Sequence, residues 1–575
     1  MAPEQTSTPS PAPSSTTRPA RIVARIGLEV LGVLVVAALA LIAVAHVLST
    51  ERAAVFLSDG DSVILPIMLR SFTSGEAQLW SMSAVFFAFP EIPLYLLSRL
   101  IGHTPQLAFV VNGVLNVLAV YAALRLIVRA VALRTTPTLA PALRIAAAIV
   151  PISWLVLLVL LEHTMLRDSF ELASLFLTTT YYSGSTLGLL FTIGLLGMTL
   201  GHGGAAGRDR IGWLIALGVL TALCIFSNPL YGVWAVAPAA ATAFVVAVVR
   251  IVPWRRSLWA VGVLSVGTLA GLVLRMPFAR YISANLDGYI RQNGWTVSSE
   301  YYGARIADTT TTAAGVVEIV LVIIAAVVTV GAAALAMMRR WHPATVTVLL
   351  ASGITIVTTF FAMMLLGTEA ARYFAPLWFA PIVALTVATA YAGVAVQRWW
   401  GAAAAAERRR RDTRVTVAAA IAVVALVGGV LAGGAVSVSR IGADPDVHRF
   451  AGAECLADWV GDQDLTGAGE FWTVRGLQAY GERNTHLLQI DANYHPYLWI
   501  TNAADFTGQD VSYLVVDSQS AWFHSPDEEL GQPAARIACG RFTILDYRGT
   551  PGEQRLTSLI SDSATQQRAE RGLDR

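Results

Sequence analysis

The sequence has no lysine, and all 40 of its basic residues are therefore arginine. Charged residues of either sign are also scarce: they make up 14% of the 575 residues, whereas hydrophobic residues make up 55%. Soluble domains average about 25% charged residues, so this composition disfavours a soluble protein. The 40 basic and 38 acidic residues nearly cancel, and the formal net charge of +2 gives no indication of a nucleic-acid partner.

Cysteine is also in short supply. The chain contains three cysteines, too few for a disulfide-based scaffold or a cysteine zinc site. The sequence shows no His/Cys metal spacing, no Walker loop, no Rossmann glycine pattern and no Ser-His-Asp order. We therefore predict no metal ligands and no cofactor, and leave the use of a divalent metal open.

Long apolar runs are abundant. A helix that crosses a membrane needs about 20 predominantly apolar residues. Segments that meet or approach this length lie at 27–49, 106–128, 145–162, 185–201, 212–227, 232–252, 259–278, 314–337, 344–367, 377–397 and 415–438. The prediction is an all-α polytopic membrane protein with about eleven transmembrane helices.

The arginines indicate how the chain is oriented. Arg129 and Arg144 lie between the second and third apolar segments, and four arginines at 408–411 lie between the last two. Loops rich in arginine are typical of the cytoplasmic side, so the N-terminus is expected inside and, after an odd number of spans, the C-terminus outside. Residues 1–26 are then a disordered cytoplasmic tail, and polar residues 553–575 a flexible tail.

The first outer loop covers residues 50–105. Segments 62–72 and 84–102 are apolar but carry charges and prolines, which predicts two helices lying on the membrane surface. Asp59 and Asp61 follow the first span, and Glu91 lies in the second surface helix. A carboxylate partly shielded from water can act as a general base, with Asp61 preferred over Asp59 and Glu91. The alternative is a solvated Asp-Gly-Asp turn.

The later outer loops supply candidate substrate-binding residues. His163, Asp168 and Tyr182 lie in the loop at about 163–184, and Tyr302 lies in the loop at about 279–313. Carboxylates and aromatic rings suit sugar binding. Aromatic residues at this depth are also typical of the belt that anchors proteins at the membrane surface, and this alternative stays open.

Arg372 lies at the outer edge of two apolar segments, where a guanidinium can bind a lipid phosphate. Arg70, in the first outer loop, is a second candidate for phosphate binding. The alternatives for Arg372 are a side chain that reaches along apolar surface to water, or an ion pair with Glu369.

The composition changes sharply at residue 440. Strand-like pieces at 485–491, 511–517 and 541–547 and a helix at 446–460 predict a small α/β or α+β extracytoplasmic domain over 440–552. Cys455 and Cys539 both lie in it, so we predict a disulfide between them. The domain also carries aromatic residues that suit either a carbohydrate platform or a packed core: Phe471, Trp472, Tyr494, Tyr497, Trp499 and Trp522.

The order of these parts resembles the polytopic membrane glycosyltransferases of the C superfamily, such as the protein O-mannosyltransferases and the lipid A aminoarabinose transferases. The resemblance rests on the acidic pair in 59–61 (DGD), on 89–97 (FPEIPLYLL) and on 372–376 (RYFAP), within about residues 27–400. The chain departs from the pattern because Asp61 is followed by Ser and because any phosphate-binding lysine must be replaced by arginine. FPE in place of the usual basic-Pro-Pro segment points to a separate bacterial subfamily.

The resemblance implies an inverting glycosyltransferase of the bacterial plasma membrane, with residues 27–439 as the transferase domain. Its partners would be a polyprenyl-phosphate sugar donor and a glycan, lipid or protein acceptor of the cell envelope. An outer-loop carboxylate would deprotonate the acceptor hydroxyl, and arginine would stabilise the departing lipid phosphate. The alternatives are a transporter or flippase for a lipid-linked glycan and a non-catalytic membrane scaffold.

Overall fold

The computed structural model describes residues 17–570 and Gly572, except for 76, 136–138, 202–206, 283–290, 292, 407–412, 482–484, 519 and 521–525. Among these residues, ten segments are long and apolar enough to cross a membrane. The helices that carry them are α1 (Thr17–Leu48), α5 (Pro105–Thr135), α6 (Pro141–Val159), α8 (Ser183–Gly201), α9 (Gly207–Ser227), α11 (Trp254–Arg275), α13 (Ala313–Met338), α14 (Pro343–Leu366), α16 (Pro381–Ala406) and α17 (Thr413–Ala443). The chain is a multi-pass membrane protein.

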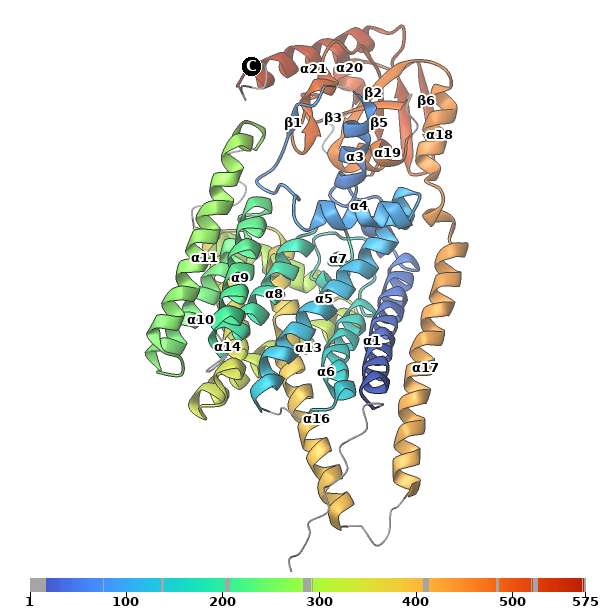
Figure 1. Cartoon of the computed structure of the whole chain (residues 1–575). Coiled ribbons are helices and arrows are strands. Elements are labelled where there is room, and N and C mark those ends of the chain that lie inside the picture. Colours follow the sequence, from blue (N-terminus) through green and yellow to red (C-terminus); the bar gives the residue numbers. More distant parts are fainter. Residues whose placement is uncertain are drawn as a thin grey trace, which may run out of the picture.

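The eleventh expected span, 232–252, is a shorter apolar helix over Gly232–Val248. It is built from a π-helical turn, η1 (Gly232–Val236), and α10 (Ala237–Val248). Figure 1 shows the long helices gathered into one bundle, with the C-terminal domain at one end. We call this end of the bundle the domain-side end.

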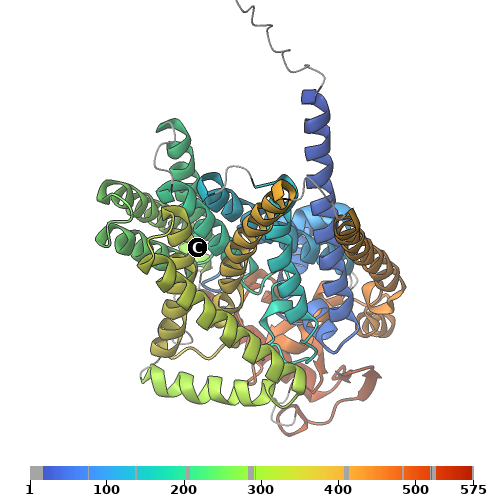
Figure 2. The same cartoon turned by 90° about the horizontal axis from the view of Figure 1, so that it is seen from below.

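Helix α17 shows how these segments suit lipid surroundings. Only 6% of its apolar window is buried inside the protein, so its apolar side chains face outward. Figure 2 shows α17 beside α1 at the edge of the bundle. A Cβ on Gly434 would lie 2.6 Å from the Cβ of Ala38, so glycine is needed for this close approach. Small residues at helix contacts are typical of membrane bundles.

The first loop contains α2 (Arg52–Leu57), α3 (Ile64–Ser74), a short strand β1 (Trp80–Ser81) and α4 (Glu91–Ile101). Helices α3 and α4 lie within the two segments that were expected to form surface helices, and α3 packs against α19 of the C-terminal domain. Residues 82–90 are not helical, and α4 begins only after Pro90. In Figure 1, α4 lies across the domain-side end of the bundle, below the C-terminal domain.

The remaining short elements connect the spans. They are α7 (Leu172–Leu175), η2 (Met276–Tyr281), α12 (Gly294–Thr309), η3 (Ala371–Phe374), α15 (Ala375–Phe379) and η4 (Pro445–Val447). Of these, α7 and η3 contact each other, although about 200 positions separate them in the chain. They bring the loop before α8 and the loop after α14 together at the domain-side end.

The C-terminal domain is a mixed five-stranded sheet with helices on both faces. Its strands are β2 (Leu465–Glu470), β3 (Thr485–Ile490), β5 (Val511–Val516), β6 (Ala535–Cys539) and β7 (Phe542–Asp546), in the order β3-β2-β5-β7-β6. β2 pairs in parallel with β3 and β5, and β7 pairs antiparallel with β5 and β6. The other elements are α18 (Ala451–Val460), α19 (Phe471–Tyr480), β4 (Thr501–Asn502), η5 (Ala503–Phe506), α20 (Pro526–Leu530) and α21 (Pro551–Glu570).

Alternation along β5 supplies the two cores of this domain. Tyr513 and Val515 pack under α18 and α19, whereas Leu514 faces the opposite core, which includes residues of α21. A disulfide joins Cys455 on α18 to Cys539 at the end of β6, with their Cα atoms 5.6 Å apart. The predicted disulfide is confirmed, and so is the predicted small C-terminal domain of α/β or α+β type.

Two expectations about the chain ends need correction. Residues 17–26, expected in a disordered tail, belong to α1, because an existing helix extends at low cost through residues such as Ala, Arg and Ile. Residues 551–570, largely in the expected flexible tail 553–575, form α21. Leu556 and Ile560 of α21 are buried against the sheet. Apolar residues spaced four apart on a largely polar helix supply this face. Residues 1–16 lie outside the described part of the chain.

The C-terminal domain is docked onto the first loop. β1 pairs antiparallel with β4, joining Trp80 to Asn502 and Ser81 to Thr501. Arg70 on α3 donates hydrogen bonds to the carbonyl oxygens of Gln478 (3.1 Å) and Gly481 (2.6 Å). The domain therefore forms a roof over the domain-side end of the bundle.

A buried guanidinium holds the loop between α6 and α8, which we call the second loop (residues 160–182). Arg52 is 1% exposed and donates hydrogen bonds to the Ser174 hydroxyl (2.8 Å) and to the carbonyl oxygens of Leu166 (2.8 Å) and Glu171 (2.5 Å). Its Nη1 also lies 3.6 Å from the Glu171 carboxylate. Each contact joins the first loop to the second, so Arg52 fixes their relative position.

We predict that Arg52→Met lowers the stability of the protein in detergent. Removing one partner of a buried ion pair leaves the other charge uncompensated and typically costs about 3–5 kcal/mol. The matched control is Arg449→Met, because Arg449 is exposed and 4.0 Å from Glu454, and exposed pairs contribute about 0–1 kcal/mol. The measurement is thermal unfolding of both purified variants. Equal midpoints for Arg52→Met and Arg449→Met would contradict the assignment.

Candidate functional site

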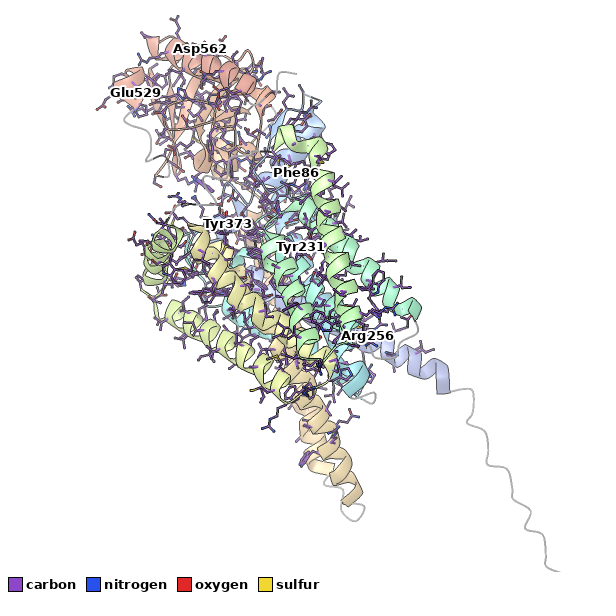
Figure 3. All side chains as sticks on the ribbon, turned by 90° about the vertical axis from the view of Figure 1, so that its left-hand side faces the viewer. Phe86, Tyr231, Arg256, Tyr373, Glu529 and Asp562 are labelled. Atoms are coloured by element: carbon purple, nitrogen blue, oxygen red, sulfur yellow. A yellow bond between two sulfur atoms is a disulfide. The ribbon has the colours of Figure 1, made fainter. Side chains whose placement is uncertain are left out.

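A cavity of about 230 Å³ lies where the bundle, the first loop and the C-terminal domain meet. We call it the junction cavity. It is lined by residues from four parts of the chain: Asp61, Ser83, Val85, Phe87, Thr180, Tyr181, Tyr182, Glu369, Ala370, Arg372, Tyr373, Trp499 and Ile500. In Figure 3, Tyr373 and Phe86 lie at the level between the bundle and the C-terminal domain, whereas Arg256 lies toward the other end.

Asp61 and Arg372 form the charged pair of the junction cavity. Nη2 of Arg372 lies 3.8 Å from Oδ2 of Asp61, and Nη1 lies 4.0 Å from Oδ1 of Asp168. The side chains of Asp61 and Arg372 are 17% and 21% exposed, so both are reachable from the cavity. Burial raises the pKa of the Asp61 carboxyl above its ordinary value, while Arg372 acts against this shift. The result is a basic carboxylate beside a cation.

Asp59 is held differently from Asp61. Its Oδ1 accepts a hydrogen bond from the Tyr181 hydroxyl and one from the Asp61 backbone N–H (3.2 Å). Its Oδ2 accepts from Nε of Arg167 at 2.8 Å. Asp59 is thus engaged through both oxygens and 7% exposed. This arrangement suits a residue that positions its neighbours.

The second loop pins the turn that carries both carboxylates. The Thr180 hydroxyl donates a hydrogen bond to the Asp61 carbonyl oxygen, and the Thr179 hydroxyl donates one to the Ser62 carbonyl oxygen (2.9 Å). Asp168 accepts a hydrogen bond from the Ala371 N–H at 2.9 Å and so fixes the position of η3. The residues of the sequence-predicted site are therefore connected through backbone contacts as well as through charges.

The C-terminal domain adds cationic and aromatic groups from α19. The guanidinium of Arg167 lies 3.5 Å from the centroid of the Trp472 ring, a cation–π contact. A Cβ on Gly60 would lie 2.6 Å from Phe471, so only glycine allows α19 to approach the Asp59–Asp61 turn this closely. These contacts bring Arg475, which is completely buried, into electrostatic range of Asp61.

Arg475 is held without full hydrogen bonding. Among the described residues, its Nε and Nη2 have no hydrogen-bond partner. Burial lowers the pKa of Arg475 to about 10, opposed by Asp61 and Asp505, so the side chain remains charged at neutral pH. Its charge therefore acts on Asp61 through space and favours the ionised carboxylate.

A second cavity, of about 350 Å³, lies on the Asp59 side of the turn. Asp59, Arg167 and Asp168 line it, together with Arg305 from α12 and Arg541 from the C-terminal domain. The carboxylates of Asp59 and Asp61 therefore face different cavities, although one glycine separates them.

The structure brings together five of the nine predicted catalytic and binding residues. Asp61, Tyr182 and Arg372 line the junction cavity, and Asp59 and Asp168 line the second cavity. The aromatic residues of the C-terminal domain that could form a carbohydrate platform lie in different places. Trp499 lines the junction cavity, and Tyr494 is buried in the domain core. Trp522 lies outside the described residues.

The other four predicted residues lie elsewhere. Glu91 is 3% exposed and lies beside Ser227 (3.5 Å) and Gly184. Arg70 binds the C-terminal domain rather than the junction cavity, because α3 directs it toward α19. His163 lies 3.6 Å from Glu171, and Tyr302 is buried with its hydroxyl 2.5 Å from that of Thr368. The predicted roles of these four residues gain no support from their positions.

Arg167, Tyr181 and Arg475, which act on Asp59 or Asp61, were not among the predicted site residues. The dipeptides Arg167-Asp168 and Tyr181-Tyr182 placed the first two beside predicted residues, so their neighbourhood was a usable signal. Arg475 lies more than 400 positions from Asp61, on a helix of another domain, and no local pattern connects them.

No group of three or more His, Cys, Asp or Glu side chains in the described part of the chain is placed to hold a metal ion. The carboxylates of Asp59 and Asp61 instead face guanidinium groups, as the ion pairs of Arg167 and Arg372 show.

At the level of sequence, no protein-family model and no curated protein matches the chain. At the level of structure, the chain is similar to ArnT from Cupriavidus metallidurans bound to undecaprenyl phosphate. That match has a TM-score of 0.50 and 16% identity, and it covers 91% of this chain and 99% of the other. The apo state of the same protein matches with a TM-score of 0.46 and 16% identity, over 95% and 99%. The chain thus has an ArnT-like fold, which agrees with the fold expected from the sequence.

The buried position of Glu91 is expected to make the stability of the folded protein depend on pH. Burial raises the pKa of the Glu91 carboxyl to about 7. The folded state then binds this proton more tightly than the unfolded state does. The stabilisation is complete below the ordinary glutamate pKa and is lost as the pH rises through about 7.

We therefore expect wild type to lose more stability than Glu91→Gln between about pH 5 and about pH 8, because the amide does not titrate. The measurement is the unfolding midpoint of both proteins across this range. Glu162, whose pKa is also raised to about 7 by burial, is present in both proteins and cancels in the difference. Parallel curves for the two proteins would show that Glu91 does not titrate in this way.

Proposed function

We propose that the protein is an inverting glycosyltransferase that moves a sugar from a polyprenyl-phosphate donor to an acceptor hydroxyl. The observation that carries the proposal is the pairing of Asp61 with Arg372 in the junction cavity, within a fold shared with a protein solved with undecaprenyl phosphate. A base and a cation that binds phosphate are the two groups that such a transfer requires.

The proposed reaction follows from these two groups. The Asp61 carboxylate takes the proton of the acceptor hydroxyl as the hydroxyl oxygen attacks the anomeric carbon. The bond between that carbon and the phosphate oxygen breaks, and the bonding electrons leave with the lipid phosphate. Arg372 stabilises the charge on the departing phosphate through hydrogen bonds that guanidinium and phosphate form well. One displacement from the opposite side inverts the anomeric centre.

Aromatic side chains around the cavity suit a sugar ring. Tyr182 and Tyr373 have ring centroids 5.5 Å apart in an edge-to-face arrangement, and Trp499 closes the cavity from the C-terminal domain. The volume of about 230 Å³ leaves room for a single sugar unit rather than a lipid chain. We infer that the sugar occupies this cavity.

We also propose the orientation in the bacterial plasma membrane. The alternation of arginine-rich loops supports an N-terminus in the cytoplasm and an extracytoplasmic C-terminal domain. The junction cavity would then open at the outer face, where a glycan, lipid or protein acceptor of the cell envelope is available. The reaction as proposed needs no cofactor.

The first functional prediction concerns Asp61. Asp61→Asn removes the base but keeps the shape of the side chain, and we expect sugar transfer to fall by about 10²–10⁴-fold. The measurement is transfer from a polyprenyl-phosphate sugar in proteoliposomes, across a panel of donors. Asp458→Asn is the matched control, because Asp458 is exposed on α18. Wild-type rates in Asp61→Asn would remove this carboxylate from the mechanism.

The second functional prediction concerns Arg475. Its charge favours the ionised form of Asp61, so Arg475→Met raises the Asp61 pKa further. The acidic limb of the pH profile of kcat/KM should then move to higher pH. Arg536→Met is the control, because Arg536 pairs with Asp527 within the C-terminal domain. A lower rate with an unmoved profile would mean that Arg475 acts only through packing.

A further inference from the structure

A third cavity lies at the opposite end of the bundle, on the helices that carry no part of the proposed active site. Its volume is about 550 Å³. It is lined by the N-terminal part of α1, the C-terminal half of α5 and the start of α6: Arg25, Glu29, Arg125, Leu126, Val128, Arg129, Pro141 and Arg144. These are the ends of the three helices that lie away from the C-terminal domain (Figure 1).

The lining carries a large excess of positive charge. Four guanidinium groups face one carboxylate, which leaves a net charge of +3. Arg125 forms an ion pair with Glu29, and Arg129 lies 5.2 Å from the ring centroid of Trp213. Arg144 is close enough to Arg25 and Arg125 for the like charges to repel one another. An anion in the cavity would relieve this repulsion.

The position and the wall of the cavity indicate the kind of anion. The three helices leave the apolar part of their spans here: the span of α1 begins at Ile22, that of α5 ends at Val131 and that of α6 begins at Pro141. Phospholipid headgroups lie at this depth. Leu126 and Val128 give the cavity an apolar wall beside the arginines, which matches an acyl chain below a phosphate.

Arginine is well suited to such a ligand, because its planar guanidinium can donate two parallel hydrogen bonds to one phosphate. We propose that this cavity binds the phosphodiester headgroup of an anionic phospholipid from the leaflet that lies away from the C-terminal domain. The bound lipid joins α1 to α5 and α6 at the end where their arginines otherwise repel. This site is separate from the proposed sugar transfer and does not depend on it.

The test is native mass spectrometry of the full-length protein in detergent, after lipid removal and titration with defined lipids. We expect wild type to retain one phosphatidylglycerol in preference to phosphatidylcholine. Arg144→Gln should weaken phosphatidylglycerol binding by roughly fivefold, since each arginine near a membrane surface contributes about that factor toward anionic lipid. Arg25→Gln, at an exposed position in the N-terminal part of α1, gives a second variant that leaves the helix contacts of α6 in place.

The matched control is Arg255→Gln, which removes the same charge from an exposed position on α11 that does not line this cavity. It should bind phosphatidylglycerol as wild type does. Equal binding by wild type, Arg144→Gln and Arg25→Gln would overturn the proposal, and so would equal binding of phosphatidylcholine. Displacement of the lipid by inorganic phosphate at the same concentration would also overturn it, because the site would then recognise a soluble anion.

Discussion

The hydrogen bonds of the buried Arg52 guanidinium hold the first and second loops together, and the arrangement of the domain-side end depends on them. Arg52 lies at the start of α2, directly after the first span, and reaches into the second loop. The Glu162 carboxylate supports the same loop from the other side, by accepting hydrogen bonds from the backbone N–H groups of Ala173 and Ser174, both at 2.6 Å. Charged groups at this depth are costly unless paired, so this network holds the loop in one arrangement.

That arrangement gives the neighbouring carboxylates of Asp59 and Asp61 different surroundings. Because the second loop is fixed, its Arg167 and Tyr181 reach Asp59 and occupy both carboxylate oxygens. Asp61, two positions on, points to the other side of the turn and faces Arg372. A carboxylate that faces a cavity and whose pKa is raised by burial can take up a proton and return to its charged form.

The sequence predicted the features that depend on local pattern. Apolar runs predicted the spans, and the prolines and charges of 84–102 argued against another span there; the segment contains the short helix α4 instead. The disulfide between Cys455 and Cys539 followed from their shared domain. Of the proposed site, Asp61, Tyr182 and Arg372 were identified because each lies just beyond an apolar segment, where the membrane boundary brings chain segments to one level.

The remaining features depend on tertiary contacts that no local pattern contains. Arg70 and Arg372 were both predicted to bind phosphate because both lie in outer loops. The Arg70 side chain instead donates hydrogen bonds to backbone carbonyl oxygens at the end of α19. Glu91 lies at the start of α4 and is buried beside Ser227 and Gly184, and it does not line the junction cavity. The expected flexible tail forms α21 because Leu556 and Ile560 are buried against the sheet. Each outcome was decided by a partner far away in the chain.

The two ends of the bundle differ in how many carboxylates lie near their arginines. This difference connects the two proposals. At the domain-side end, Arg52, Arg167 and Arg372 each face a carboxylate of the protein. At the other end, four arginines and one glutamate line the third cavity. A site that must exchange its substrate benefits from charges already balanced within the protein. In a site that keeps a permanent ligand, the ligand can neutralise the excess charge. A bound phosphodiester would supply this negative charge.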